Sequence, residues 1–269
     1  MLSADDLQAL DAFLIDLNRS SAAVILPLFR ADHGLENKRE GGGFDPVTAA
    51  DRGAEAAIRK RIAERWPSHG VIGEEYGEDR PDADFVWVLD PIDGTRAFIA
   101  GLPVWTTLIA LRHQGRPVLG SIGQPYVGEL FIGHAGGSRL MSRGASRPLA
   151  VRRATPLSSA IIATTDPHGC FDKAEMAAWR SVRAAARLAR LGCDAYAYAM
   201  VAAGLIDLVL EAGLKCWDIE AAEPVIAGAG GLITNWSGAP IGRHGGQVAI
   251  AGDSDLLAEV LPLLAAAAA

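Results

Sequence analysis

Apolar residues near the beginning of the chain recur three and four positions apart, with acidic residues on the other side. This is the period of an amphipathic helix, so a helix is expected from Leu7 onward. A second helix is expected over residues 52–65, which are rich in Ala, Glu, Arg and Lys. Thr48 or Asp51 is expected to cap its start, and Trp66–Pro67 to end it.

The middle of the chain follows the pattern of β-strands instead. Short apolar runs bounded by turn residues are typical of strands. The later runs follow one another closely, which predicts an antiparallel meander that continues over residues 140–151, with Trp105 in the core. The polar stretch 77–84 is expected to be a loop. The predicted strands are 71–75, 85–89, 102–111, 118–124 and 129–133.

Beyond residue 160, strands and helices alternate. Asp218 is expected to cap a helix that begins at Ile219, in which Pro224 produces a kink. Ser254 is expected to cap the last helix. No repeat is visible, and no linker is long enough to separate independent domains. The predicted strands are 161–165, 207–211, 232–234 and 248–251, and the other predicted helices are 173–191 and 196–206.

The strongest chemical signal follows the apolar run 85–89. Asp90 and Asp93 come directly after it, on either side of Pro91, which lacks an N–H and is expected to end the strand. Gly94 then permits a tight turn. Two carboxylates this close repel each other unless a cation or a proton lies between them, and hard oxygen ligands suit Mg²⁺ or Mn²⁺. The pattern therefore predicts a metal site.

Composition limits the partners and the compartment. A formal charge of −7 argues against nucleic acid, because a phosphate backbone requires a basic face. The arginines within 180–190 are interpreted as a solvated helix face. Cys170, Cys193 and Cys216 lie far apart, which predicts no disulfide framework and favours a cytoplasmic location. An acidic amino terminus without a long apolar run predicts neither a signal peptide nor a membrane span.

Four motifs, in this order, resemble those of the inositol monophosphatase-like, magnesium-dependent, lithium-sensitive phosphatases. The resemblance implies a layered αβαβα fold, usually as a homodimer. It also implies an α+β amino-terminal half, residues 1–140, and an α/β carboxyl-terminal half, residues 141–269, fused in one unit. The motifs are Asp45–Pro46–Val47–Thr48–Ala49–Ala50–Asp51, Ile72–Gly73–Glu74–Glu75, Asp90–Pro91–Ile92–Asp93–Gly94–Thr95, and Trp217–Asp218–Ile219 followed by Ala229–Gly230–Gly231.

The same resemblance assigns roles to individual residues. It implies two or three Mg²⁺ ions, with Glu74 and the Thr95 hydroxyl orienting and deprotonating a water. The backbone N–H groups of Gly94 and Thr95, at a helix start, are suited to bind the phosphate. The implied metal ligands are Glu74, Asp90, the carbonyl of Ile92, Asp93 and Asp218.

Other residues are expected at the periphery of this site. Asp51, a further catalytic candidate, and Lys38 match positions at its edge. By resemblance the glycine-rich segment is a mobile loop that closes over the metals, although its composition alone is equally typical of a disordered surface connection. Glu75 is adjacent to Glu74 on the predicted strand and points to the other face. It is equally consistent with exposure to solvent, with support of a metal ligand and with metal ligation itself. The loop residues are Lys38, Gly41, Gly42 and Gly43.

Local details favour one small-molecule phosphate ester, L-histidinol phosphate. A basic residue, Arg96, follows the threonine of the third motif, and Pro224 lies within the predicted helix after Asp218, which resembles the histidinol-phosphatase branch of the family. Asp194 and Glu211 match positions that face the organic part of the substrate, and acids there would favour an ammonium and an imidazole. Carboxylates also accept hydrogen bonds from inositol hydroxyls, so inositol 1-phosphate stays an alternative. A non-catalytic binding partner of the same fold is a third hypothesis.

Overall fold

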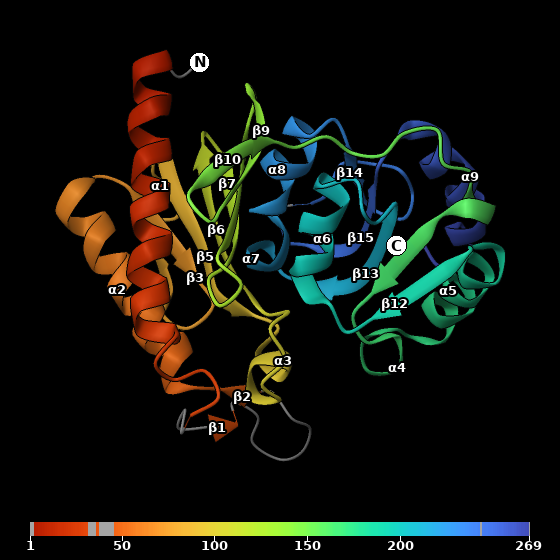
Figure 1. Ribbon diagram of the computed structural model, residues 1–269, viewed down its shortest axis with the longest axis horizontal. Coiled ribbons are helices and arrows are strands. Elements are labelled where there is room, and N and C mark those ends of the chain that lie inside the picture. The colour runs from red at the N-terminus through yellow and green to blue at the C-terminus, as the bar shows by residue number, and fades with distance from the viewer. Residues whose placement is uncertain (1–2, 32–35, 38–45, 243, 269) are drawn as a thin grey trace.

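A computed structural model describes residues 3–31, 36–37, 46–242 and 244–268. The elements form five layers, helices, sheet, helices, sheet, helices, which run from left to right in Figure 1. This confirms the layered αβαβα fold predicted from the sequence. Within the described residues, no helix is both long and apolar enough to cross a membrane.

The first outer layer consists of α1 (Ala4–Ile25) and α2 (Ala49–Arg65). Thr48 is the N-cap of α2, as expected, and it forms a capping box with Asp51. The short strands β1 (Glu36–Asn37) and β2 (Pro46–Val47) pair with each other beside this layer. The predicted loop residues Lys38, Gly41, Gly42 and Gly43 lie outside the described residues.

The first sheet has eight strands in the order β10-β9-β8-β7-β6-β5-β3-β4. Strands β5 to β10 form the predicted meander, whereas β3 is parallel to β5. The expected loop 77–84 is partly wrong, because β4 pairs with β3 as an exposed polar edge strand. The strands are β3 (Gly70–Gly73), β4 (Gly77–Asp79), β5 (Phe85–Asp93), β6 (Thr106–His113), β7 (Arg116–Gln124), β8 (Glu129–His134), β9 (Gly137–Ser142) and β10 (Ala145–Pro148).

The second sheet has five strands in the order β12-β11-β13-β15-β14, of which β12, β11 and β13 are parallel. The predicted helix 173–191 is too long. It ends at Ala185, and the next residues form β12, because the N–H groups of Arg187 and Leu188 bond to the carbonyl of Ala160 and lead the chain onto β11. The strands are β11 (Ile161–Thr164), β12 (Leu188–Leu191), β13 (Leu208–Leu214), β14 (Leu232–Thr234) and β15 (Gly246–Ala251).

Two helical layers complete the fold. The middle layer lies between the sheets, and the last covers the far face of the second sheet (Figure 1). Asp253, rather than the predicted Ser254, caps the final helix, and its Oδ1 accepts the N–H groups of Asp255 and Leu256. The helices are α6 (Asp194–Ala202), α7 (Cys216–Ile219) and α8 (Ala222–Gly228) in the middle, and α4 (Pro167–Cys170), α5 (Lys173–Ala185) and α9 (Ser254–Leu264) outside.

The middle helices pack directly on the first sheet. A Cβ at Gly120 on β7 would lie 2.2 Å from the carbonyl oxygen of Ala221, and one at Gly133 on β8 would lie 2.3 Å from the Cα of Val225. Only glycine allows this approach. On the other face of the sheet, buried apolar side chains of α1 and α2 contact Trp87 and its neighbours. The predicted core residue Trp105 is fully buried. The division of the chain at residue 140 stays a prediction.

Candidate active site

Strand β5 does not end where Pro91 was expected to end it. It continues to Asp93, and its pairing with β6 shifts between Asp90 and Asp93. A proline is tolerated at such an irregularity because no ladder hydrogen bond is required of its nitrogen. The Pro91 carbonyl accepts the hydroxyl of Thr107 at 2.8 Å. The irregularity therefore keeps both aspartates within β5, at its carboxyl end.

A third aspartate joins this pair from the other half of the chain. Oxygen atoms of Asp90, Asp93 and Asp218 all lie within 4.8 Å of one another. The prediction that Asp218 is an N-cap is wrong, because Asp218 is the third residue of α7. Its Oδ2 accepts the N–H of Lys215 at 2.6 Å. A separate helix, α8, follows, and Pro224 lies in its first turn, where no N–H is needed. The expected kinked helix is thus two short helices.

The electrostatics of this cluster favour a cation. Burial, and then the charge of Glu74, raises the pKa of Asp90 well above its usual value. Burial and the charge of Asp194 do the same to the pKa of Asp93. Burial raises the pKa of Asp218 to about 7. Each shift reports that a buried negative charge is disfavoured. A divalent cation with oxygen ligands would remove that penalty, so these residues fit Mg²⁺.

A cavity of about 270 Å³ opens above the cluster. Its lining contains six carboxylates, together with one guanidinium, that of Arg96. Most of the site residues predicted from the sequence meet in it. The predicted residues that line it are Glu74, Asp90, Ile92, Asp93, Gly94, Thr95, Arg96, Asp194, Glu211 and Asp218.

Asp51 does not line this cavity. It is buried, and its Oδ2 accepts the N–H of Thr48 at 2.8 Å and the Thr48 hydroxyl at 2.5 Å. Its negative charge nevertheless contributes to the raised pKa of Asp90. Asp51 therefore acts on the cluster through its charge and through the start of α2.

The turn after β5 brings Gly94 and Thr95 to the cavity. Gly94 has a φ of +83°, in the left-handed region that favours glycine. A Cβ there would lie 2.9 Å from the carboxylate of Asp194. The short helix α3 (Thr95–Ile99) begins at the next residue, and the Thr95 hydroxyl donates to the Ile92 carbonyl at 3.1 Å. A phosphate site at these N–H groups stays a prediction.

The second sheet and α6 supply the opposite wall. Burial raises the pKa of Glu211, on β13, to about 8, and its Oε1 accepts the Thr165 hydroxyl at 2.8 Å. Burial raises the pKa of Asp194 to about 6, although the charge of Arg96 opposes the shift. The N–H of Ala195 donates to Asp93 at 2.7 Å and so joins α6 to β5.

Thr165 and Asp166 are among the residues at or beside this cavity that the sequence did not single out. Arg96 pairs with Asp166 across the gap between α3 and α4, with 3.3 Å between Nη1 and Oδ2. Thr165 lines the cavity directly after β11. Thr165 ends the predicted strand 161–165 and Asp166 follows it, and polar residues at the carboxyl end of a parallel strand are a signal that could have found them.

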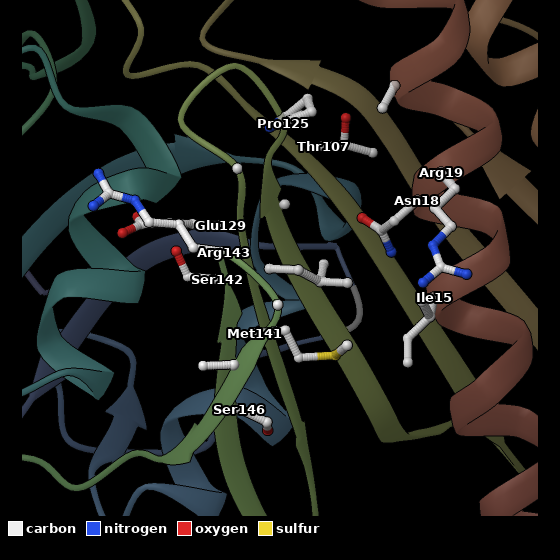
Figure 2. A pocket seen from close by; sticks show the side chains of 16 residues that line it. Ile15, Asn18, Arg19, Thr107, Pro125, Glu129, Met141, Ser142, Arg143 and Ser146 are labelled. Carbon is white, nitrogen blue, oxygen red and sulfur yellow. The ribbon is translucent and has the colours of Figure 1, made fainter.

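A larger cavity lies elsewhere. It has a volume of about 540 Å³ and lies between α1 and the strands around Met141 (Figure 2). Among the described residues that line it, Glu129 is the single acid, and its carboxylate accepts the hydroxyl of Tyr196. This cavity therefore lacks the ligands that a metal-dependent reaction needs.

The five layers and the cluster of carboxylates agree with the comparisons, which support a hydrolase of the phosphatase class. The chain belongs to the inositol monophosphatase family, whose model matches residues 6–268. Over 255 residues it is 42% identical to the "Bifunctional phosphatase IMPL2, chloroplastic" of Arabidopsis thaliana. The aligned region covers 91% of this chain and 72% of that protein. It is 33% identical over 221 residues to a histidinol-phosphatase of Mycobacterium tuberculosis, covering 81% and 84%. An inositol monophosphatase structure from Zymomonas mobilis has a TM-score of 0.82 and 39% identity, covering 93% and 95%.

Proposed function

We propose that the chain is a Mg²⁺-dependent phosphate monoester hydrolase that converts L-histidinol phosphate and water to L-histidinol and phosphate. One observation carries the proposal. The carboxylates of Asp90, Asp93 and Asp218 lie within 4.8 Å of one another in a cavity whose lining includes three further acids. Such a site is stable with divalent cations bound and can then accept a phosphate dianion.

The residues that would hold the metal are Glu74, the three clustered aspartates and the carbonyl of Ile92. Two or three Mg²⁺ ions, or Mn²⁺, would neutralise the phosphate and lower the pKa of a bound water. The Thr95 hydroxyl donates a hydrogen bond to the Ile92 carbonyl, so its lone pairs can accept a hydrogen bond from a water and orient it. Glu74 would take a proton from this water, and the N–H groups of Gly94 and Thr95 would bind the phosphate oxygens.

The choice of substrate rests on the far wall of the cavity. Asp194 is partly buried and Glu211 is buried, and burial raises the pKa of both carboxyls, so a negative charge on either is disfavoured. An ammonium or a protonated imidazole would compensate such a charge, and histidinol carries both groups. The histidinol-phosphatase name of a 33% identical relative agrees with this choice. Inositol 1-phosphate is the second candidate, because a 39% identical structure is that of an inositol monophosphatase.

The decisive assay compares kcat/KM for L-histidinol phosphate and inositol 1-phosphate on the same preparation. We expect the histidinol ester to be preferred, and a clear preference for inositol 1-phosphate would overturn the substrate. Asp194→Asn should raise KM for the histidinol ester more than for the inositol ester. Asp82→Asn, which removes the same charge from an exposed loop, is the matched control and should change neither value.

Catalysis itself is tested separately. A non-catalytic binding partner of the same fold would hydrolyse neither ester, and Asp93→Asn would then equal the unmodified chain. We expect hydrolysis that depends on Mg²⁺, is inhibited by Li⁺ and is lost in Asp93→Asn. We also propose that the protein is a cytoplasmic homodimer, which sedimentation at several concentrations would test for its oligomeric part.

A further inference from the structure

A buried carboxylate outside the cavity holds the turn that carries Glu74. Glu55 lies on α2, and its side chain is fully buried. Its Oε2 accepts the N–H of Glu75 at 2.8 Å, and its Oε1 accepts the N–H of Tyr76 at 3.2 Å. The two oxygens therefore bind the backbone of the two residues that follow Glu74.

A second side chain of α2 completes this attachment. The Nε of Arg59 donates to Glu55 Oε1 at 2.7 Å, and the guanidinium also donates to the carbonyl of Gly77 at 2.5 Å. Arg59 thus supplies the opposite charge that a buried carboxylate needs. The pair reaches three successive residues, Glu75 and Tyr76 in the turn after β3 and Gly77 at the start of β4.

The strand before the turn is in direct contact with the same carboxylate. A Cβ at Gly73, the last residue of β3, would lie 2.1 Å from Glu55 Oε1. No side chain larger than hydrogen fits there unless the carboxylate moves. The backbone on both sides of Glu74 therefore contacts Glu55, whereas the N–H of Glu74 itself donates to the carbonyl of Leu89 on β5 at 3.2 Å.

We propose that Glu55 is a positioning residue for the metal site: it fixes the turn so that Glu74 stands beside Asp90. The proposal rests on the proposed function, because it treats Glu74 as a metal ligand. Glu74 and Asp90 line the same cavity, so the turn that carries Glu74 sets where its side chain stands relative to the aspartates. A residue that only stabilised the fold would bond anywhere along the hairpin, but Glu55 bonds immediately next to Glu74.

The test measures metal binding without substrate, with Mn²⁺ as the probe in electron paramagnetic resonance titrations. Glu55→Gln keeps the shape of the side chain but replaces one acceptor oxygen with an NH₂ group, which faces a backbone N–H. We expect the Mn²⁺ dissociation constant to rise roughly ten-fold or more, as is typical when a ligand loses its supporting hydrogen bonds. Amide hydrogen exchange at Glu75 and Tyr76 in the metal-free protein should become faster.

Ile62→Val is the matched control, because Ile62 is also a buried residue of α2 but packs in the core rather than on the turn. It should lower the melting temperature and leave the Mn²⁺ dissociation constant within about two-fold of the unmodified chain, since it creates only a small core defect. If Glu55→Gln behaves like this control, with lower stability and unchanged Mn²⁺ affinity, the proposal is wrong.

A second variant covers the case in which Glu55→Gln does not fold. Glu55→Asp keeps the charge but withdraws the carboxylate from the turn by one methylene, and it should also weaken Mn²⁺ binding. Unchanged affinity in this variant would equally overturn the role of Glu55. Failure of the unmodified chain to bind Mn²⁺ would instead overturn the proposed function, so the two failures are distinguishable.

Discussion

Replacing Asp93 with asparagine should stabilise the metal-free protein. Two unit charges 4.8 Å apart repel by about 3 kcal/mol at an effective dielectric constant of about 20. Protonation relieves part of this, because burial and neighbouring acids raise the pKa of Asp93. The amide oxygen can still accept the N–H of Ala195, so the link between β5 and α6 is retained. We expect a net gain of roughly 1–2 kcal/mol, or about 2–8 °C in melting temperature.

Added Mg²⁺ should reverse this order. A ligand at a hundred times its dissociation constant stabilises the folded state by about 2.7 kcal/mol, and the unmodified chain should gain this while Asp93→Asn gains little. Differential scanning calorimetry in EDTA and in Mg²⁺ measures both quantities. Asp82→Asn controls for net charge. A variant that is less stable than the unmodified chain in EDTA, or that gains as much from Mg²⁺, would refute the cluster as the metal site.

Three further predictions concern stability. Gly133→Ala should cost about 1–3 kcal/mol in urea denaturation, because the new Cβ meets Val225, whereas Gly242→Ala, whose Cβ meets nothing within 4 Å, should cost less. The pKa of Glu211 is about 8 in the folded state, against 4.5 ordinarily, so its contribution to stability should be lost as the pH rises through about 8, and Glu211→Gln should remove this dependence in metal-free protein. Burial, and then the charge of Arg80, lowers the pKa of His69 to about 4. The free energy of unfolding should therefore fall as the pH drops from 6.5 towards 4. An NMR titration that shows His69 becoming protonated near pH 6.5 would contradict this prediction.

The acids of the site could be predicted because they follow local patterns. Asp90 and Asp93 come after an apolar run, and a strand end is where polar ligands gather. The detailed path could not be predicted. Pro91 cannot donate to a regular ladder. The residues on both sides of it nevertheless pair with β6, so β5 continues through a register shift. Asp218 precedes helix-forming residues, which suggests a cap, yet its contact with the Lys215 N–H begins the helix earlier.

Tertiary pairing decided the remaining differences. Residues 188–191 continue the helical pattern of α5 and become a strand only because β11 offers a free edge beside them. Glu55 was missed for a related reason. It lies in a segment rich in charged residues, where a glutamate is ordinarily solvated, and its burial depends on a turn formed twenty residues later along the chain. Neither fact is encoded within a short window of sequence.

The place of the middle helices along the chain has a consequence for synthesis. The first sheet is complete at Pro148. Its inner face carries apolar residues such as Val86 and Phe131, and the helices that cover this face span residues 194–228. A ribosome delivers the amino-terminal end first, so this apolar face emerges well before its cover. Until residue 228 has left the exit tunnel, the growing chain exposes the apolar face of this sheet to solvent. A chaperone that binds exposed apolar surfaces would bind the chain at this face.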